Sequence, residues 1–321
     1  MLSKPETPYK PFPLFQLPII VTTEVLLCLS PLEVINISRV TSRTKNVVKT
    51  LLPQKLRDEF KTCVKFLHGP RILVKYSNAE SQTVVFRTNQ QSVTAPSPNV
   101  LDDCINLVEY ITDLFNTPIY FIGIDVTLFK NQHQSIIDWL FSKQDTVQNF
   151  LIRGKNVSTE TFSAVWNRIR KVERCLGLDM VVEDNFQCDI LFDLPELYIN
   201  YSNWFNIDKL LKCDCVKLFL FLSSLRPADL NRFFRSWLLS ETNARLTLLT
   251  VEIDSRDLLE QILDLPEESI DESEDNIREH AKKDEICRRE LKIKRNDGKK
   301  AVLTTRFIPR LQRLDLIMRV I

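Results

Sequence analysis

The sequence predicts an α/β chain in which a small all-α unit at the N-terminus is followed by an arc of repeated β-α units with a C-terminal β-hairpin cap. Three observations lead to this fold class. Short helical patterns near the start are opened by prolines or capping residues, a strand template recurs from residue 119 onward, and an Asn-Asp-Gly turn separates two strand-like segments near the end. The 321 residues suffice for an extended domain and a small module.

Composition excludes several classes of protein. The net charge is +1, so no overall field attracts nucleic acid or an anionic membrane. The five glycines form no phosphate-binding loop, and the eight cysteines include no C-x-x-C pair. We therefore expect no cofactor and no metal, while acid/base chemistry by paired carboxylates stays open as an alternative. The cysteine usage indicates an intracellular location in a reducing compartment, either cytoplasm or nucleus.

The N-terminal unit is expected at residues 11–52, after a flexible lead at residues 1–10. Pro18 opens a first helical pattern, because its missing N–H costs nothing at a helix start. Pro31 opens a second helix, and Ser42 is expected to cap a third that runs to Leu52. This gives a small helical unit that is unusually apolar.

Residues 53–98 are expected to form a linker and a β-hairpin. Two strand patterns, at residues 71–77 and 83–89, flank a turn at residues 78–81. Asn99 is placed to cap a helix that ends near Phe115, and residues 99–321 are expected to form one repeat-like domain.

The template L-x-x-L-x-L-x-x recurs along this domain and predicts strands stacked as in a leucine-rich-repeat-like solenoid. The matching segments are 119–127, 147–155, 173–181, 194–202, 215–223 and 246–254. Helical patterns fill the longer gaps, including residues 136–141, 162–169 and 230–238. A closed, doubly wound sheet would give a similar alternation and stays open as an alternative.

The C-terminal region begins with a charged insertion at residues 266–286. Residues 290–307 then read as a hairpin that turns at residues 296–298, and a last strand from residue 313 is expected to close the end of the arc.

The opening stretch resembles an F-box. The motif positions are Leu17-Pro18, Val25-Leu26, Leu29, Pro31, Glu33-Val34, Val40 and Ser42. The blocks "INYSNWFNIDKLLKCDCVKLFL" and "DLNRFFRSWLLSETNARLTLLTVEI" are similar to the type-2 F-box-associated domain of nematode F-box proteins. Together the two parts cover most of residues 11–253.

The resemblance implies a non-catalytic substrate receptor of a Skp-cullin-F-box ubiquitin ligase. Its partner would be the Skp-type adaptor and, through it, a cullin–RING ligase. The residues expected to contact the adaptor are Leu17, Pro18, Val25, Leu26, Leu29 and Pro31.

The arc would then bind a protein substrate of unknown identity. Template positions three, five and seven point away from the apolar side of each strand. Among them, the predicted substrate-binding residues are Phe121, Arg153, Tyr198, Asn200, Phe219 and Phe221. Tyr198 and Phe219 are expected to be neighbours, and Asp125, Arg153 and Asp179 are expected to line up on adjacent strands.

Two departures from the F-box pattern support an alternative. Ile20 stands where an acidic residue is usual, and the tryptophan near the end of the motif is missing. The chain could therefore be a leucine-rich-repeat-like interaction scaffold with a degenerate F-box and no ligase role.

Overall fold

The computed structural model describes residues 14–76, 82–85, 99–255, 259–270 and 291–321. It is a mixed α/β protein with two compact units. The first contains the described residues up to Lys65 together with Gly69–Tyr120, and the second contains Phe66–His68 and Phe121–Ile321. The helix after Asn99 lies in the first unit. The predicted lead at residues 1–10 and the turn at 78–81 lie outside the described residues.

The first unit begins with short helices that end where their sequence requires. They are η1 (Leu14–Gln16), α1 (Ile19–Cys28), α2 (Pro31–Ser38), α3 (Ser42–Leu51) and α4 (Gln54–Glu59). The helix starts predicted at Pro18 and Pro31 are confirmed. The backbone N–H of Ser30 donates to the Glu33 carboxylate at 2.8 Å, which completes a capping box at α2.

The predicted cap of α3 is displaced by one residue. Thr41, rather than Ser42, precedes the helix, and its hydroxyl accepts a hydrogen bond from the backbone N–H of Thr44 at 3.0 Å. Threonine and serine both carry a side-chain oxygen that can cap a helix. The sequence alone therefore did not show which of Thr41 and Ser42 is the cap.

The rest of the first unit joins strands to a long helix. It comprises β1 (Phe60–Phe66), β2 (Pro70–Tyr76), β3 (Gln82–Val85) and α5 (Val100–Phe115). The antiparallel pairing of β2 with β3 confirms the predicted hairpin, whereas β1 was not predicted. The rings of Phe60 and Phe115 stack with centroids 3.6 Å apart.

Helix α5 is tied to the N-terminal helices by polar contacts. The Asp113 carboxylate lies 2.7 Å from Lys45 Nζ, and Tyr110 donates from its hydroxyl to Ser38 Oγ at 2.8 Å. The hydrogen bonds from Lys45 and Lys49 lower the pKa of Asp113. The helical unit and α5 therefore belong to one packed body.

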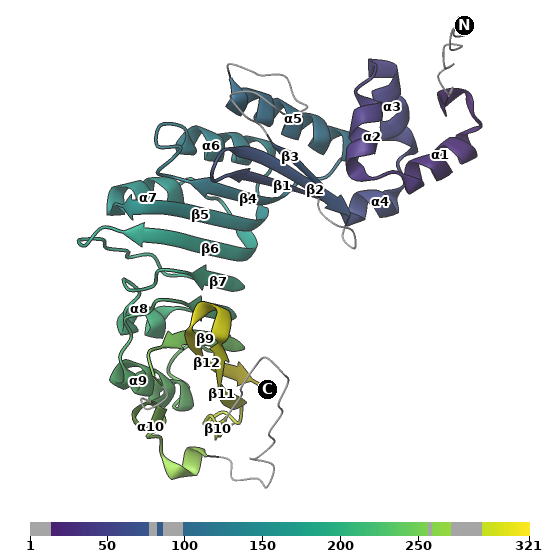
Figure 1. Cartoon of the computed structure of the whole chain (residues 1–321). Helices are drawn as coiled ribbons and strands as arrows, with labels where there is room; N and C mark the ends of the chain where they lie inside the picture. The colour runs from purple at the N-terminus through teal and green to yellow at the C-terminus, as the bar shows by residue number, and fades with distance from the viewer. Residues whose placement is uncertain (1–13, 77–81, 86–98, 256–258, 271–290) are drawn as a thin grey trace, which may run out of the picture. The chain divides into compact units, whose positions relative to one another are not determined.

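The second unit is built on parallel strands that follow one another in chain order (Figure 1). They are β4 (Ile119–Asp125), β5 (Val147–Val157), β6 (Val172–Val182), β7 (Glu196–Ile199), β8 (Lys217–Leu220) and β9 (Leu248–Ile253). Each strand coincides with one predicted template segment. The fourth template position forms a ladder across the sheet: Ile122, Phe150, Leu176, Leu197, Leu218 and Leu249.

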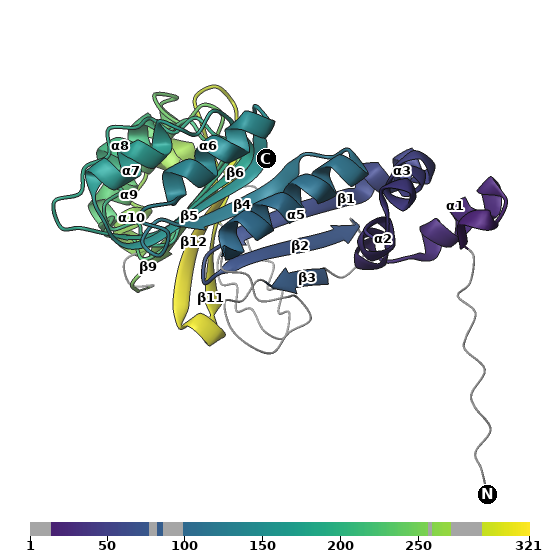
Figure 2. The same cartoon turned by 90° about the horizontal axis from the view of Figure 1, so that it is seen from above.

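Helices lie on one side of these strands (Figure 2). They are α6 (His133–Lys143), α7 (Thr159–Trp166), α8 (Ile207–Lys212), α9 (Pro227–Leu238) and α10 (Leu259–Ile262). A doubly wound sheet reverses its strand order and carries helices on both faces. The single direction of strand order fits stacked repeats instead, and the curvature of the predicted arc stays a prediction.

Three antiparallel strands continue the sheet beyond β9. These are β10 (Leu291–Lys294), β11 (Lys300–Ile308) and β12 (Arg313–Val320), arranged in the order β9-β12-β11-β10. The predicted hairpin and last strand are thereby confirmed. Of the predicted charged insertion, residues 266–270 include the short helix η3 (Glu267–Ser269), and the remainder lies outside the described residues.

The β10–β11 turn is held by a charged pair. The Arg295 guanidinium is buried and donates from Nε to Asp297 Oδ1 at 2.9 Å. It also lies over the Trp237 ring, with its carbon 5.3 Å from the ring centroid. These hydrogen bonds from Arg295 lower the pKa of Asp297 from its ordinary value of 3.8 to about 2.

The lowered pKa of Asp297 predicts an acid-sensitive contribution to stability. A depressed folded-state pKa stabilises the protein above the unfolded-state value and loses that effect as pH falls toward 2. We expect Asp297→Asn to lower the urea midpoint at pH 7, and the difference from the parent chain to vanish near pH 2. Asp184→Asn, in the exposed turn after β6, is the control. An equal difference at both pH values would contradict this assignment.

Candidate functional site

One face of the second unit's sheet carries half-exposed side chains, and we call it the open face. On β7, Leu197 and Ile199 are buried, whereas Glu196 and Tyr198, which alternate with them, are half-buried. Strand β8 repeats this alternation. The open face therefore consists of the template positions that point away from the helices, as the period of a strand requires.

The centre of the open face is an aromatic pair. Tyr198 and Phe219 are register partners on β7 and β8, and their rings stack with centroids 4.0 Å apart and an interplanar angle of 6°. This confirms that they are neighbours. Burial raises the pKa of the Tyr198 hydroxyl, and the nearby carboxylate of Glu196 raises it further.

Further apolar side chains extend from the aromatic pair toward β4. Gly123 on β4 and Gly177 on β6 leave room for them. A Cβ placed at Gly177 would meet Leu151 Cδ1 at 2.9 Å, and one at Gly123 would meet the Phe121 ring at 3.2 Å. Leu151 and Phe121 thus occupy the space that side chains at the glycines would fill. We call Phe121, Leu151, Tyr198 and Phe219 the apolar row. The glycines at template position five were the available sequence signal, and it was missed.

Polar side chains lie on one side of the apolar row. Arg153 Nε is 3.5 Å from Asp179 Oδ2, and the Asn200 side-chain amide donates to Asp179 Oδ1 at 3.1 Å. This cluster therefore joins β5, β6 and the residue that follows β7. Asp125 is in register with Arg153, as predicted, but its carboxylate accepts hydrogen bonds from the backbone N–H groups of Thr127 and Leu128.

Ionic contacts also surround the row near β8. Lys217 Nζ lies 2.8 Å from Glu196 Oε1 on the neighbouring strand. The Arg313 guanidinium lies over the Phe221 ring, 4.0 Å from its centroid. Phe221 is therefore partly covered by β12. Of the six predicted substrate-binding residues, the structure brings together Tyr198 with Phe219 and Arg153 with Asn200, while Phe121 lies on β4 at the far end of the row.

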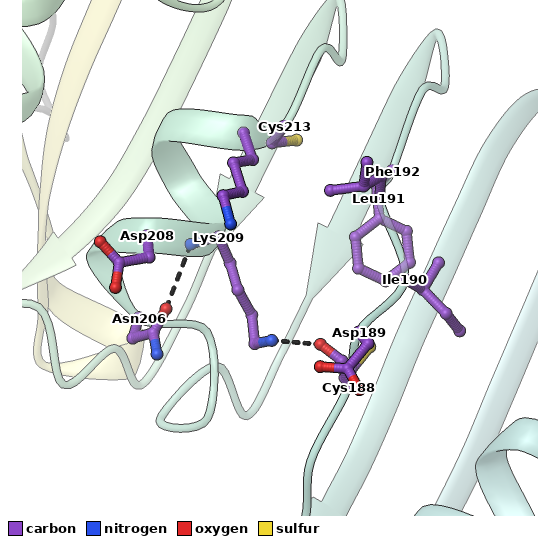
Figure 3. Close-up of a pocket in the computed structure, with 10 residues that line it drawn as sticks. Cys188, Asp189, Ile190, Leu191, Phe192, Asn206, Asp208, Lys209 and Cys213 are labelled. Carbon is purple, nitrogen blue, oxygen red and sulfur yellow. Dashed lines mark hydrogen bonds between the residues drawn. The ribbon is translucent and has the colours of Figure 1, made fainter.

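A separate cavity of about 450 Å³ lies between the segment after β6 and helix α8 (Figure 3). Lys209 spans it, donating from Nζ to the backbone oxygen of Cys188. Asp189 and Asp208 lie on its two sides, and Asp208 is 3.6 Å from Arg232. Cys213 also lines it, and a hydrogen bond from the Cys215 thiol lowers the pKa of Cys213. No pattern in the sequence indicated this cavity.

The first unit exposes apolar side chains on its N-terminal helices. Ile19 and Ile20 are 70% and 76% exposed, and Val21, Leu27 and Val40 are also exposed. Helix α1 does not gather its apolar side chains on one side, so the side that packs inward could not be chosen from its pattern.

The six predicted adaptor-binding residues differ in burial. Leu26 and Pro31 are buried within the helical unit, so their side chains stabilise its core. Leu17, Val25 and Leu29 are half-buried, and Pro18 is exposed. Sequence reasoning thus named residues around the exposed surface but missed Ile19, Ile20 and Leu27.

Residues 185–251 match the family model described as F-box associated. This segment carries β7, α8, β8, α9 and most of β9, and therefore contains Tyr198, Phe219 and the cavity beside α8. The match fits an F-box protein. No curated protein and no solved structure matches the chain.

Within the described residues, no helix combines the length and apolar character needed to cross a membrane. The same residues contain no group of three or more His, Cys, Asp and Glu side chains placed to hold a metal ion.

The two faces of β7 are expected to respond differently to truncation. Leu197 is fully buried, so Leu197→Ala should lower the free energy of unfolding by about 2–5 kcal/mol. Tyr198→Ala should cost less, since the half-exposed ring loses mainly its stacking on Phe219, worth about 0.5–1.5 kcal/mol. Urea denaturation of both variants measures the difference. Equal losses would mean that the open face is part of the core.

Proposed function

We propose that the protein is a non-catalytic substrate-recognition subunit of a Skp-cullin-F-box ubiquitin ligase. The observation that carries the proposal is the match of residues 185–251 to the F-box-associated family, combined with an N-terminal helical unit that resembles an F-box and exposes apolar side chains. The helical unit would bind the Skp-type adaptor, and the open face would bind the substrate.

The exposed side of α1 supports adaptor binding through apolar contacts. Burying an exposed isoleucine contributes roughly 1.5–3 kcal/mol before the costs of association, so a few such residues suffice for a stable interface. Ile19, Ile20 and Leu27 would supply the contacts, with Pro18, Leu17, Val25 and Leu29 beside them. Leu26 and Pro31 would act indirectly, by holding the helices in place.

The open face supports protein recognition by its composition. Aromatic residues next to arginine are enriched in binding hot spots. The apolar row has this character, with Arg153 and Arg313 beside it. The ligase partners would supply the chemistry, and this chain would raise the local concentration of the substrate.

Charge placed on α1 tests adaptor binding. We expect Ile20→Asp to abolish co-purification of a Skp-type adaptor while leaving the thermal unfolding profile unchanged, because Ile20 is 76% exposed. Leu128→Asp is the matched control, since Leu128 is 62% exposed in the second unit. If the parent chain also fails to retain the adaptor, the chain is better described as a scaffold with a degenerate F-box.

Truncation of the aromatic pair tests substrate binding. We expect Tyr198→Ala combined with Phe219→Ala to abolish capture of cellular proteins when the proteasome is blocked, with adaptor co-purification retained. The measurement is quantitative affinity purification of parent and variant chains. Loss of adaptor and captured proteins together would indicate unfolding, and retention of both would remove the aromatic pair from the substrate site.

A further inference from the structure

The ion pairs of the open face share one arrangement: the base is more exposed than the acid. Lys217 is 43% exposed and its partner Glu196 only 16%. Arg153 is 35% exposed and its partner Asp179 is 25% exposed. Each carboxylate therefore lies deeper than the cation it pairs with.

At the β12 end of the open face the bases are again more exposed than the acid, and the acid is more deeply buried there. The Asp315 side chain is fully buried and is paired in register with Arg306 on β11 and Glu252 on β9. Arg306 and Arg313 both contact Asp315, and their side chains are 32% and 18% exposed. The two guanidinium groups thus lie above a carboxylate that a partner cannot reach.

Two further acids of this face are also engaged. Asp125 accepts two backbone hydrogen bonds at the end of β4, and Glu252 accepts one from the backbone N–H of Leu222 at 2.6 Å. The five carboxylates named so far are therefore directed inward or occupied. The surface that a partner meets beside the apolar row is cationic.

These cations stand on both sides of the apolar row. Lys217 precedes Phe219 by two residues on β8, so it lies about 6–7 Å along the strand on the same face. Arg153 lies on the opposite side of the row, at the level of Asn200 and Asp179, and Arg313 lies over Phe221 on that same side. An apolar centre is thus bordered by positive charge along two edges.

We propose that the open face binds a segment of a partner protein in which an apolar side chain is flanked on both sides by aspartate or glutamate. This rests on the proposed function and names the substrate class. The flanking carboxylates would pair with Lys217 and Arg153, and the apolar side chain would pack on Tyr198 and Phe219. Exposed ion pairs contribute only about 0–1 kcal/mol, so exchanging their partners is inexpensive.

The ring geometry favours a peptide over a nucleic acid. Single-stranded nucleic acids bind by stacking bases on aromatic faces. Tyr198 and Phe219 already stack on each other, which occupies one face of each ring.

The test uses the full chain and three fluorescent peptides with the same Leu-Phe centre, flanked on both sides by Asp, Asn or Lys pairs. Anisotropy titrations at low salt should give tightest binding for the Asp-flanked peptide, with an affinity that falls as salt rises. Lys217→Gln and Arg153→Gln should each weaken it by about threefold to tenfold. Arg170→Gln is the control, because it removes an exposed cation that follows α7 and pairs with Asp145. This variant should bind the Asp-flanked peptide as tightly as the parent chain does.

Three results would overturn the inference. They are equal binding of the Asp- and Asn-flanked peptides, an equal loss with Arg170→Gln, and tighter binding of a single-stranded oligonucleotide at the same site. If no peptide binds but Tyr198→Ala with Phe219→Ala still removes captured proteins, the proposed function stands and the acidic substrate class is wrong. If no peptide binds and the variant with Tyr198→Ala and Phe219→Ala captures as much cellular protein as the parent chain, the open face is not the substrate site.

Discussion

The second unit depends on two ladders of buried apolar side chains that run across its parallel strands. One ladder contains the fourth template positions, from Ile122 to Leu249, and the other contains the sixth, from Ile124 to Val251. Every member of both ladders is at most 1% exposed. Because a one-residue slip would turn each strand's apolar set to the other face, the ladders fix the register of the whole sheet. A single strand could not cover this surface, so each repeat requires its neighbours.

This constraint separates stability from recognition within each strand. Leu197 and Leu218 hold the sheet to its helices, while the residues that follow them, Tyr198 and Phe219, are left to the open face. The open-face positions can change without altering the register, since the ladders already determine it.

The sequence predicted the periodic parts of the fold well and the local polar contacts poorly. Each strand from β4 to β9 coincides with a template segment, and the Tyr198–Phe219 contact followed from register alone. Asp125 was expected opposite Arg153, but its carboxylate is taken by backbone N–H groups of its own turn, a choice that periodicity does not encode. Strand β1 was missed although its residues alternate between buried and half-buried as a strand requires.

The side of α1 that faces outward was also unpredictable, and the reason bears on function. A helix whose apolar side chains gather on no single side has no preferred inward face, so the packing of α2 and α3 decides which residues remain exposed. The exposed side chains of Ile19 and Ile20 do not stabilise the fold. In the second unit, by contrast, the apolar residues of both ladders are buried, as their template positions predict. In a chain that otherwise satisfies its pattern, a local violation of this kind points to a surface completed by a partner. The open face avoids the same exposure by placing Lys217 and Arg153 beside its aromatic pair, which keeps that surface polar at its edges.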